Sequence, residues 1–191
     1  AAEIFGVSNG GVTSDQRRTA KVINFGLIYG MSPFGLSKSL GITIDAAKIY
    51  IDKYFMRYPM VASFMENTKE FAKTNGYVQT VFGRKLWLPE INSPNGPRRQ
   101  ASERAAINAP MQGTAADLIK KAMISVQKII SENNFSSKMI LQVHDELIFE
   151  TPTKEVEKFS ECLEQAMCSS AKLIVPLEVD IGFGENWEQA H

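Results

Sequence analysis

Residues 17–30 read R-R-T-A-K-V-I-N-F-G-L-I-Y-G and decide how the start of this chain folds. Four of their side chains recur at intervals of four: Arg17, Lys21, Phe25 and Tyr29. This spacing predicts an α-helix that carries all four on one face, over roughly 18 Å. Two cations near a helix N-terminus suit a polyanion, and an aromatic ring two turns on suits a sugar or a base. A nucleoside triphosphate fits this face with its phosphates toward Arg17; the alternative is an amphipathic core helix with two solvated basic residues.

A second pattern lies at residues 139–150, M-I-L-Q-V-H-D-E-L-I-F-E. It places His144, Asp145 and Glu146 between two apolar, β-prone runs, which predicts a hairpin with its charged residues at the turn. Paired strands hold a carboxylate more rigidly than a loop does, as metal-assisted catalysis requires. An ordinary polar hairpin turn is the alternative.

These two patterns, with a third block between them, resemble the family A DNA polymerases. Residues 17–30 are similar to that family's motif B, and V-H-D-E at 143–146 is similar to its motif C. The block E-R-A-A-I-N-A-P-M-Q-G-T-A-A-D at 103–117 matches a third family pattern, and G-E-N-W-E-Q-A-H at 184–191 is similar to the family's C-terminus. The resemblance therefore covers essentially the whole chain.

The resemblance implies an α+β fold, in which helical fingers are followed by part of an antiparallel-sheet palm. It implies fingers at 1–112, with the motif B helix at about 14–29, and the C-terminal part of the palm at 113–191, with the motif C hairpin at about 138–151. In this family the first catalytic aspartate lies upstream, in motif A, and no D-Y-S-like strand motif occurs in this chain. We therefore expect a C-terminal fragment of the polymerase domain, inactive alone.

The resemblance also implies roles for the stripe on the first helix. Arg17 and Lys21 bind the incoming triphosphate, and Lys21 also acts in catalysis by stabilising or protonating the leaving pyrophosphate. Phe25 packs against the sugar and base, and Tyr29 lies at the helix end beside the template.

The DNA contacts are expected on a later helix. Arg104, Asn108 and Gln112 share one face at i, i+4 and i+8, where a cation and two amides can contact phosphates and minor-groove acceptors. The resemblance assigns DNA binding to these three and to His144, which positions the primer terminus. A capped, exposed helix face is the alternative for the three helical residues.

The metal site is expected at the hairpin turn. The resemblance implies two Mg²⁺ ions held by Asp145 together with the upstream aspartate, one activating the primer 3′-hydroxyl and the other steadying the triphosphate. Glu146 is a supporting catalytic residue that matters less than Asp145, because neighbours on a strand point to opposite sides.

The implied function is DNA-templated DNA polymerisation in replication or repair, with a primer-template and deoxynucleoside triphosphates as partners and a monomeric parent chain. Two alternatives stay open: a single-subunit RNA polymerase, and a binding module for DNA or nucleotides without catalysis. Phe25 and the block around Gln112 favour DNA over RNA synthesis.

The composition is that of a globular protein: 191 residues, 44% hydrophobic, with 21 basic and 21 acidic side chains. Charge is nevertheless segregated, with an acidic stretch at 145–161 and a basic region: Arg84, Lys85, Arg98, Arg99 and Arg104. Two cysteines without a C-x-x-C spacing predict reduced thiols. No apolar run approaches membrane-spanning length and no signal-peptide pattern is found, so we expect a cytoplasmic protein that contacts no membrane.

Periodicity and breaker residues predict the remaining elements. The expected helices lie at 1–7, 14–29, 31–40, 43–54, 58–75, 98–133 (with a kink or restart at Pro110) and 154–173. The expected strands lie at 77–81, 85–88, 138–143, 146–151 and 177–182. Thr13 or Ser14 is expected to cap the second helix, and Gly30 to end it.

Overall fold

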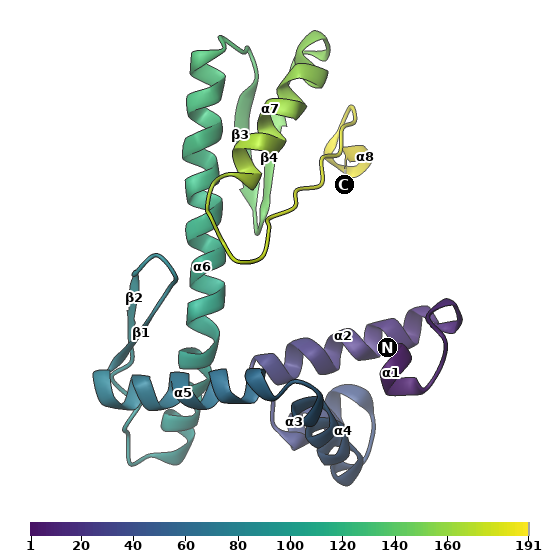
Figure 1. Ribbon diagram of the computed structural model, residues 1–191, viewed down its shortest axis with the longest axis vertical. Coiled ribbons are helices and arrows are strands. Elements are labelled where there is room, and N and C mark those ends of the chain that lie inside the picture. The colour runs from purple at the N-terminus through teal and green to yellow at the C-terminus, as the bar shows by residue number, and fades with distance from the viewer. Residues whose placement is uncertain (191) are drawn as a thin grey trace. The chain divides into compact units, whose positions relative to one another are not determined.

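A computed structural model describes residues 1–190 of the chain (Figure 1). It divides into two compact units, Ala1–Gly113 and Thr114–His191, and helix α6 (Gly96–Glu132) passes through the boundary. Helices dominate, and the strands form two separate two-stranded antiparallel sheets. The predicted α+β fold class is confirmed.

The first unit is mainly helical. Its elements are α1 (Ala2–Phe5), the 3₁₀ turn η1 (Asn9–Gly11), α2 (Ser14–Ile28), α3 (Pro33–Leu40), α4 (Ile44–Arg57), α5 (Pro59–Asn75), β1 (Tyr77–Gln79), β2 (Lys85–Trp87) and the first part of α6. All the helices and both strands predicted for this region are present, with boundaries that differ by a few residues.

Local side-chain chemistry sets the helix ends. Thr13 and Gln16 form a capping box at the start of α2: the Gln16 N–H donates to Thr13 Oγ1 at 3.2 Å, and the Thr13 N–H donates to Gln16 Oε1 at 2.9 Å. Thr43 caps α4 with a single hydrogen bond, which the Ala46 N–H donates to Thr43 Oγ1 at 3.2 Å. Gly41 and Gly76, at the C-termini of α3 and α5, adopt the left-handed conformation that favours glycine.

Helices α2, α3 and α4 share a small hydrophobic core. Ile23 and Leu27 of α2 are buried against Leu36 of α3 and Ala47 of α4. Burying a side chain the size of leucine stabilises a fold by roughly 1.5–3 kcal/mol. This core therefore holds one face of α2 inward and leaves its opposite face for other contacts.

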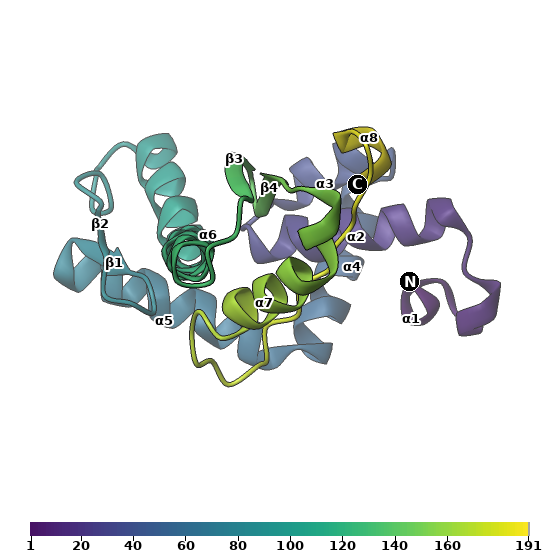
Figure 2. The ribbon, with the colours of Figure 1, turned by 90° about the horizontal axis from the view of Figure 1, so that it is seen from above.

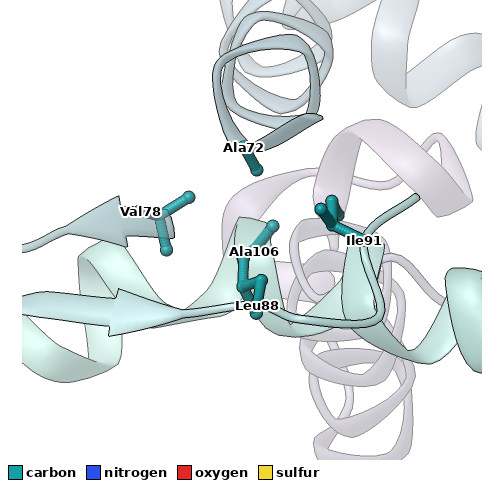
Figure 3. Close-up of a cluster of buried hydrophobic side chains, with 5 residues drawn as sticks. All are labelled: Ala72, Val78, Leu88, Ile91 and Ala106. Atoms are coloured by element: carbon teal, nitrogen blue, oxygen red, sulfur yellow. The ribbon is translucent and has the colours of Figure 1, made fainter. Parts of the chain in front are cut away.

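A second cluster joins α5, the β1–β2 hairpin and α6. Figure 3 shows its side chains converging from these elements and from the segment that follows β2: Ala72, Val78, Leu88, Ile91 and Ala106. Strand β1 pairs with β2 from Tyr77–Trp87 to Gln79–Lys85, so Val78 faces the cluster from the middle of the hairpin.

The second unit packs a helix and a hairpin against the later part of α6. Its elements are β3 (Lys138–Val143), β4 (Glu146–Glu150), the 3₁₀ turn η2 (Thr153–Glu155), α7 (Val156–Cys168) and α8 (Trp187–Ala190). Val126 and Ile130 of α6 pack with Phe159, Leu163 and Ala166 of α7, and Met139 and Phe149 of the hairpin cover this core. Figure 2, in which this part of α6 is seen end-on, shows α7 and the hairpin beside it.

Three predictions for the later elements were wrong. The segment 177–182 does not form a strand, because a strand needs a partner and β3 and β4 of the described chain pair only with each other. Helix α7 ends at Cys168, where the Ser169 hydroxyl donates to the Gln165 carbonyl instead of the chain continuing as helix. Helix α6 begins at Gly96, two residues before the predicted start, and Asn95 Oδ1 accepts from the Arg98 N–H at 3.2 Å. Of the kink or restart predicted at Pro110, the restart is absent, because α6 is continuous through Pro110.

Within residues 1–190, no helix has both the length and the apolar character needed to cross a membrane.

Candidate functional site

Helix α2 carries the predicted stripe on its exposed face. Arg17 and Lys21 are exposed, the Phe25 side chain is 53% exposed and that of Tyr29 is 38% exposed. Ile23, on the buried face, is only 2% exposed. The predicted arrangement of these side chains is thus present: a helix held from one side presents two cations and two rings on the other.

The two aromatic rings of the stripe lie against each other. The Phe25 and Tyr29 rings are stacked with their centroids 6.4 Å apart and their planes at 22°. Stacked rings of this exposure form a flat apolar surface, which is the kind of surface that sugars and bases contact.

A hollow of about 560 Å³ borders the cationic part of the stripe. Its wall includes Arg17, Lys21 and Asn24 from α2, and Lys53 and Tyr54 from α4. Tyr54 Oη donates to Asn24 Oδ1 at 2.9 Å and so ties the two helices together. Burial of Tyr54 raises the pKa of its phenol, so it remains a donor.

An ion pair between α1 and α4 lines the hollow. Arg57 Nε lies 3.2 Å from Glu3 Oε2. The hydrogen bond from Arg57 and its positive charge lower the pKa of the Glu3 carboxyl. Arg57 is thereby neutralised by the protein itself, whereas no ion pair engages Lys21 or Arg17 within residues 1–190.

The end of α2 lies against the helix that carries the predicted DNA contacts. Gly30 has φ 75°, and a Cβ on it would lie 3.3 Å from Cγ of Arg104 and 3.8 Å from Cδ1 of Ile107. A side chain at this position would therefore be strained and crowded. Tyr29, adjacent to Gly30, is brought close to Arg104, although 75 residues separate them in sequence (104 − 29).

The three predicted DNA-binding residues of α6 differ in exposure. Arg104 and Gln112 are exposed, and Asn108 is partly buried. Asn108 Oδ1 is buried and has no hydrogen-bond partner within residues 1–190. An unsatisfied buried acceptor costs about 1–3 kcal/mol, so this amide keeps hydrogen-bonding capacity that the described chain does not use.

Several of the other basic side chains are engaged by the protein. Arg84 Nη2 donates to the Gly113 carbonyl at 2.9 Å, and Arg99 Nη1 donates to the Ser93 carbonyl at 3.0 Å. These hydrogen bonds within the protein account for the positions of the two guanidinium groups, so no ligand is needed to explain them.

The β3–β4 hairpin carries the predicted carboxylates. Val143 pairs with Glu146, so the turn consists of His144 and Asp145, both exposed. His144 has φ 52°, in the left-handed region, and its carbonyl accepts from Gln142 Nε2 at 3.0 Å. This conformation costs a non-glycine residue about 1–2 kcal/mol.

The positive φ of His144 is a feature that the sequence did not predict. Unfavourable backbone geometry persists where the surrounding structure imposes it, and such residues cluster at functional sites. A glycine would adopt this φ at lower cost, although histidine is more frequent at positive φ than most other residues.

The hairpin alone offers few metal ligands. Between residues 1 and 190 there is no group of three or more His, Cys, Asp or Glu side chains arranged to hold a metal ion. Asp145 and Glu146 nevertheless supply the hard carboxylate oxygens that Mg²⁺ prefers. Two carboxylates fit only a part of the coordination shell of such an ion.

The predicted site residues fall in both units. The α2 stripe and the α6 residues Arg104, Asn108 and Gln112 belong to the first unit, and residues 144–146 belong to the second. Within the first unit, the structure brings the end of the stripe next to Arg104.

Comparisons with known proteins match the whole chain. The profile of a family described as DNA polymerase family A matches residues 1–189. The chain is 53% identical over 191 residues to a DNA polymerase I of Pseudomonas aeruginosa and 46% identical over 187 residues to one of Caldicellulosiruptor bescii. These alignments cover 100% and 98% of this chain but 21% and 22% of those proteins, so the chain spans about a fifth of their length.

A solved structure has the same fold. It is described as the POL domain of Pol1 from M. smegmatis in complex with DNA primer-template and dNTP. Its TM-score is 0.96 at 41% sequence identity, covering 99% of this chain and 33% of that one.

Proposed function

The chain belongs to DNA polymerase family A, and we propose that it supplies the nucleotide-binding helix and part of the metal site of a DNA-templated DNA polymerase. The observation that carries the proposal is the exposed stripe of α2, which runs from Arg17 to Tyr29. The first unit then corresponds to the fingers and the second to the later part of the palm.

The cations of α2 bind the triphosphate of the incoming nucleotide. Arg17 offers a planar guanidinium that can hold phosphate oxygens in two hydrogen bonds, and Lys21 offers a compact charge one turn further on. As the bond to pyrophosphate breaks, negative charge grows on the leaving group, and Lys21 stabilises that charge or transfers a proton to it. No ion pair within residues 1–190 competes for either side chain.

The aromatic end of α2 orients the nucleotide. Phe25 packs against its sugar and base, and Tyr29, stacked on Phe25, lies beside the template position. Holding the nucleotide along a rigid helix lowers the barrier because the reacting groups are already aligned. The contact between Gly30 and Arg104 keeps this end of the helix next to the DNA-binding residues of α6.

Asp145, together with an aspartate outside this chain, would hold two Mg²⁺ ions through its carboxylate oxygens. Such ions would supply activation of the primer 3′-hydroxyl and neutralisation of charge on the phosphates. The paired strands β3 and β4 fix the position of the Asp145 carboxylate, and Glu146 supports it. His144 positions the primer terminus from the same turn.

Three side chains of α6 hold the DNA without reading its sequence. Arg104 contacts a phosphate, and the amides of Asn108 and Gln112 reach minor-groove acceptors, which are similar for all base pairs.

A primer-extension assay tests the proposal. We compare the 191-residue chain with a longer protein that also carries motif A and the thumb, using a labelled primer-template and all four deoxynucleotides. The longer protein is expected to extend the primer according to the template, and the shorter chain is not, because one carboxylate pair cannot hold two metal ions.

Each other outcome of this assay has a definite meaning. Preferential incorporation of ribonucleotides by the longer protein favours an RNA polymerase. DNA binding without any extension by the longer protein favours a non-catalytic module. Robust template-dependent extension by the 191-residue chain alone contradicts the proposed division of the metal site.

A further inference from the structure

The outer face of the β1–β2 hairpin is aromatic and cationic although it faces solvent. Successive residues of a strand point to opposite sides, so the buried Val78 marks the inner face. The outer face carries two cross-strand pairs, Tyr77 with Trp87 and Gln79 with Lys85. A solvent-facing strand surface is ordinarily polar, so two aromatic side chains here need an explanation.

The rings form a row held by edge-to-face contacts. Phe71 of α5 and Tyr77 have centroids 5.6 Å apart at 87°, and Tyr77 and Trp87 have centroids 5.1 Å apart at 60°. Trp87, at the end of the row, is still 65% exposed. The contacts fix the ring orientations, while most of the indole surface stays available to a ligand.

A lysine cation lies over this row. Lys85 Nζ is 4.1 Å from the centroid of the Tyr77 ring and 5.7 Å from that of Trp87. Within residues 1–190 it forms no ion pair, and the segment 76–88 contains Arg84 and Lys85 but no aspartate or glutamate. The positive charge of this face is therefore not balanced by its own strands.

We propose that this outer face binds single-stranded DNA, with a base stacked on Trp87 and a backbone phosphate at Lys85. Exposed rings interleaved with cations bind single strands without sequence preference, because every base has a π-face and every nucleotide a phosphate. In a duplex the bases already stack on one another and are not available to the indole. The surface uses no residue of the α2 stripe and goes beyond the proposed nucleotide site.

The chain provides its own reporter for this interaction. Its tryptophans are Trp87 and Trp187, so a Trp187→Phe variant leaves Trp87 as the sole indole. Titration of that variant with an oligothymidylate of eight nucleotides is expected to quench Trp87 emission in a saturable way, because a base stacks on the ring. In a Trp87→Phe variant, the remaining Trp187 emission stays unchanged.

Binding of the same oligonucleotide, labelled and followed by anisotropy, measures the energetic contribution. Trp87→Ala is expected to weaken binding at least about fivefold, the lower limit for one stacked base, and Trp87→Phe to recover most of the affinity. Lys85→Gln should reduce the slope of log K against log salt by about 0.7. Lys128→Gln, which removes an exposed charge paired with Glu132 on α6, is the matched control and leaves the slope unchanged.

Three results would overturn the proposal. The first is saturated oligonucleotide binding with unchanged Trp87 emission. The second is equal affinity of Trp87→Ala and the parent protein, with circular dichroism showing that both are folded. The third is equal quenching by a blunt duplex, which shows that the face responds to charge and not to unstacked bases.

Discussion

Helix α2 and the β3–β4 hairpin present their functional side chains in different ways. On α2, side chains spaced four apart reach solvent together because Ile23 and Leu27 anchor the opposite face. On the hairpin, two exposed residues share a tight turn, and one of them, His144, has an unfavourable backbone conformation. The helix offers an extended row suited to a long ligand, and the hairpin offers one fixed point suited to an ion.

The hydrogen bonds that stabilise these two regions also differ. Helix α2 starts at a capping box between residues three apart in sequence. The start of β3 is held from a distance: Glu155 accepts hydrogen bonds from the Ser136 N–H at 2.8 Å and from Ser137 Oγ at 3.2 Å. A contact between neighbours in sequence thus stabilises the start of α2, and contacts across 18 and 19 residues stabilise the start of β3.

The largest loss of activity is expected for a substitution in the turn of the β3–β4 hairpin. In the longer protein, Asp145→Asn removes a metal-ligand charge but keeps the side-chain shape. We expect the single-turnover rate to fall about 10³-fold, on the order of 4 kcal/mol of transition-state stabilisation, with DNA affinity unchanged. Glu146→Gln, at the neighbouring residue, is the comparison and should lower the single-turnover rate by a smaller factor. A near-normal rate for Asp145→Asn would exclude it as a ligand.

A smaller loss of activity, with a different effect on KM and kcat, is expected for a substitution on α2. Lys21→Ala should lower kcat/KM about 10²-fold through both a higher nucleotide KM and a lower kcat, because the charge meets the triphosphate before and during the reaction. Lys48→Ala on α4, where the lysine is paired with Asp45, is the matched control. Steady-state kinetics decide the outcome: if both parameters stay unchanged in Lys21→Ala, the stripe does not face the nucleotide.

The strain at the turn predicts opposite effects on stability and activity. His144→Gly should raise the free energy of unfolding by about 1 kcal/mol, because glycine adopts positive φ without the Cβ penalty. It should also reduce primer extension, since the imidazole is lost. Asn134 has the same φ of 52°, and the short polar side chain of asparagine can stabilise this conformation by local hydrogen bonding, so Asn134→Gly should raise the free energy of unfolding by less. Urea unfolding measures the free energy of unfolding of both variants. Equal increases would show that His144 is not unusually strained.

The smallest effect concerns the support of β3 by Glu155. Burial opposes ionisation of this carboxyl, but the hydrogen bonds from Ser136 and Ser137 prevail and lower its pKa. A lowered folded-state pKa gives stability that is present above the ordinary value of 4.5 and is lost as the pH falls through the folded-state pKa. Glu155→Gln should therefore lower the melting temperature at pH 7, and this deficit should shrink in acid.

The control for the melting temperatures at different pH is Glu157→Gln. Glu157 is an exposed residue in the first turn of α7, two positions after Glu155. A deficit for Glu155→Gln that is constant between pH 7 and pH 3 would show that the charge of the carboxylate does not support β3.

Local patterns predicted the fold of the first unit well. The positions of Thr13, Gly30 and Gly41 fixed the helix ends, and the spacing of Arg17 to Tyr29 fixed the exposed face of α2. These features depend on residues within one or two helical turns of one another, which is the range that sequence periodicity reports.

Features that depend on distant partners were not predictable. The segment 177–182 has the alternation of a strand, but pairing depends on an adjacent edge that its own residues do not encode. The left-handed φ of His144 follows from the two-residue register of the hairpin, and the contact of Gly30 with Arg104 follows from helix packing. Neither leaves a local pattern in the sequence.

The most direct test of the nucleotide site replaces Phe25 with tyrosine in the longer protein. The phenylalanine ring offers no hydrogen bond near the 3′ position of the sugar, whereas a phenolic hydroxyl can substitute for the group that a dideoxynucleotide lacks. The measurement is the ratio of kcat/KM for deoxynucleotides over dideoxynucleotides in both proteins. We predict a high ratio for the parent and a sharply lower ratio for Phe25→Tyr, with normal incorporation little changed. Equal ratios would contradict the placement of the nucleotide along α2.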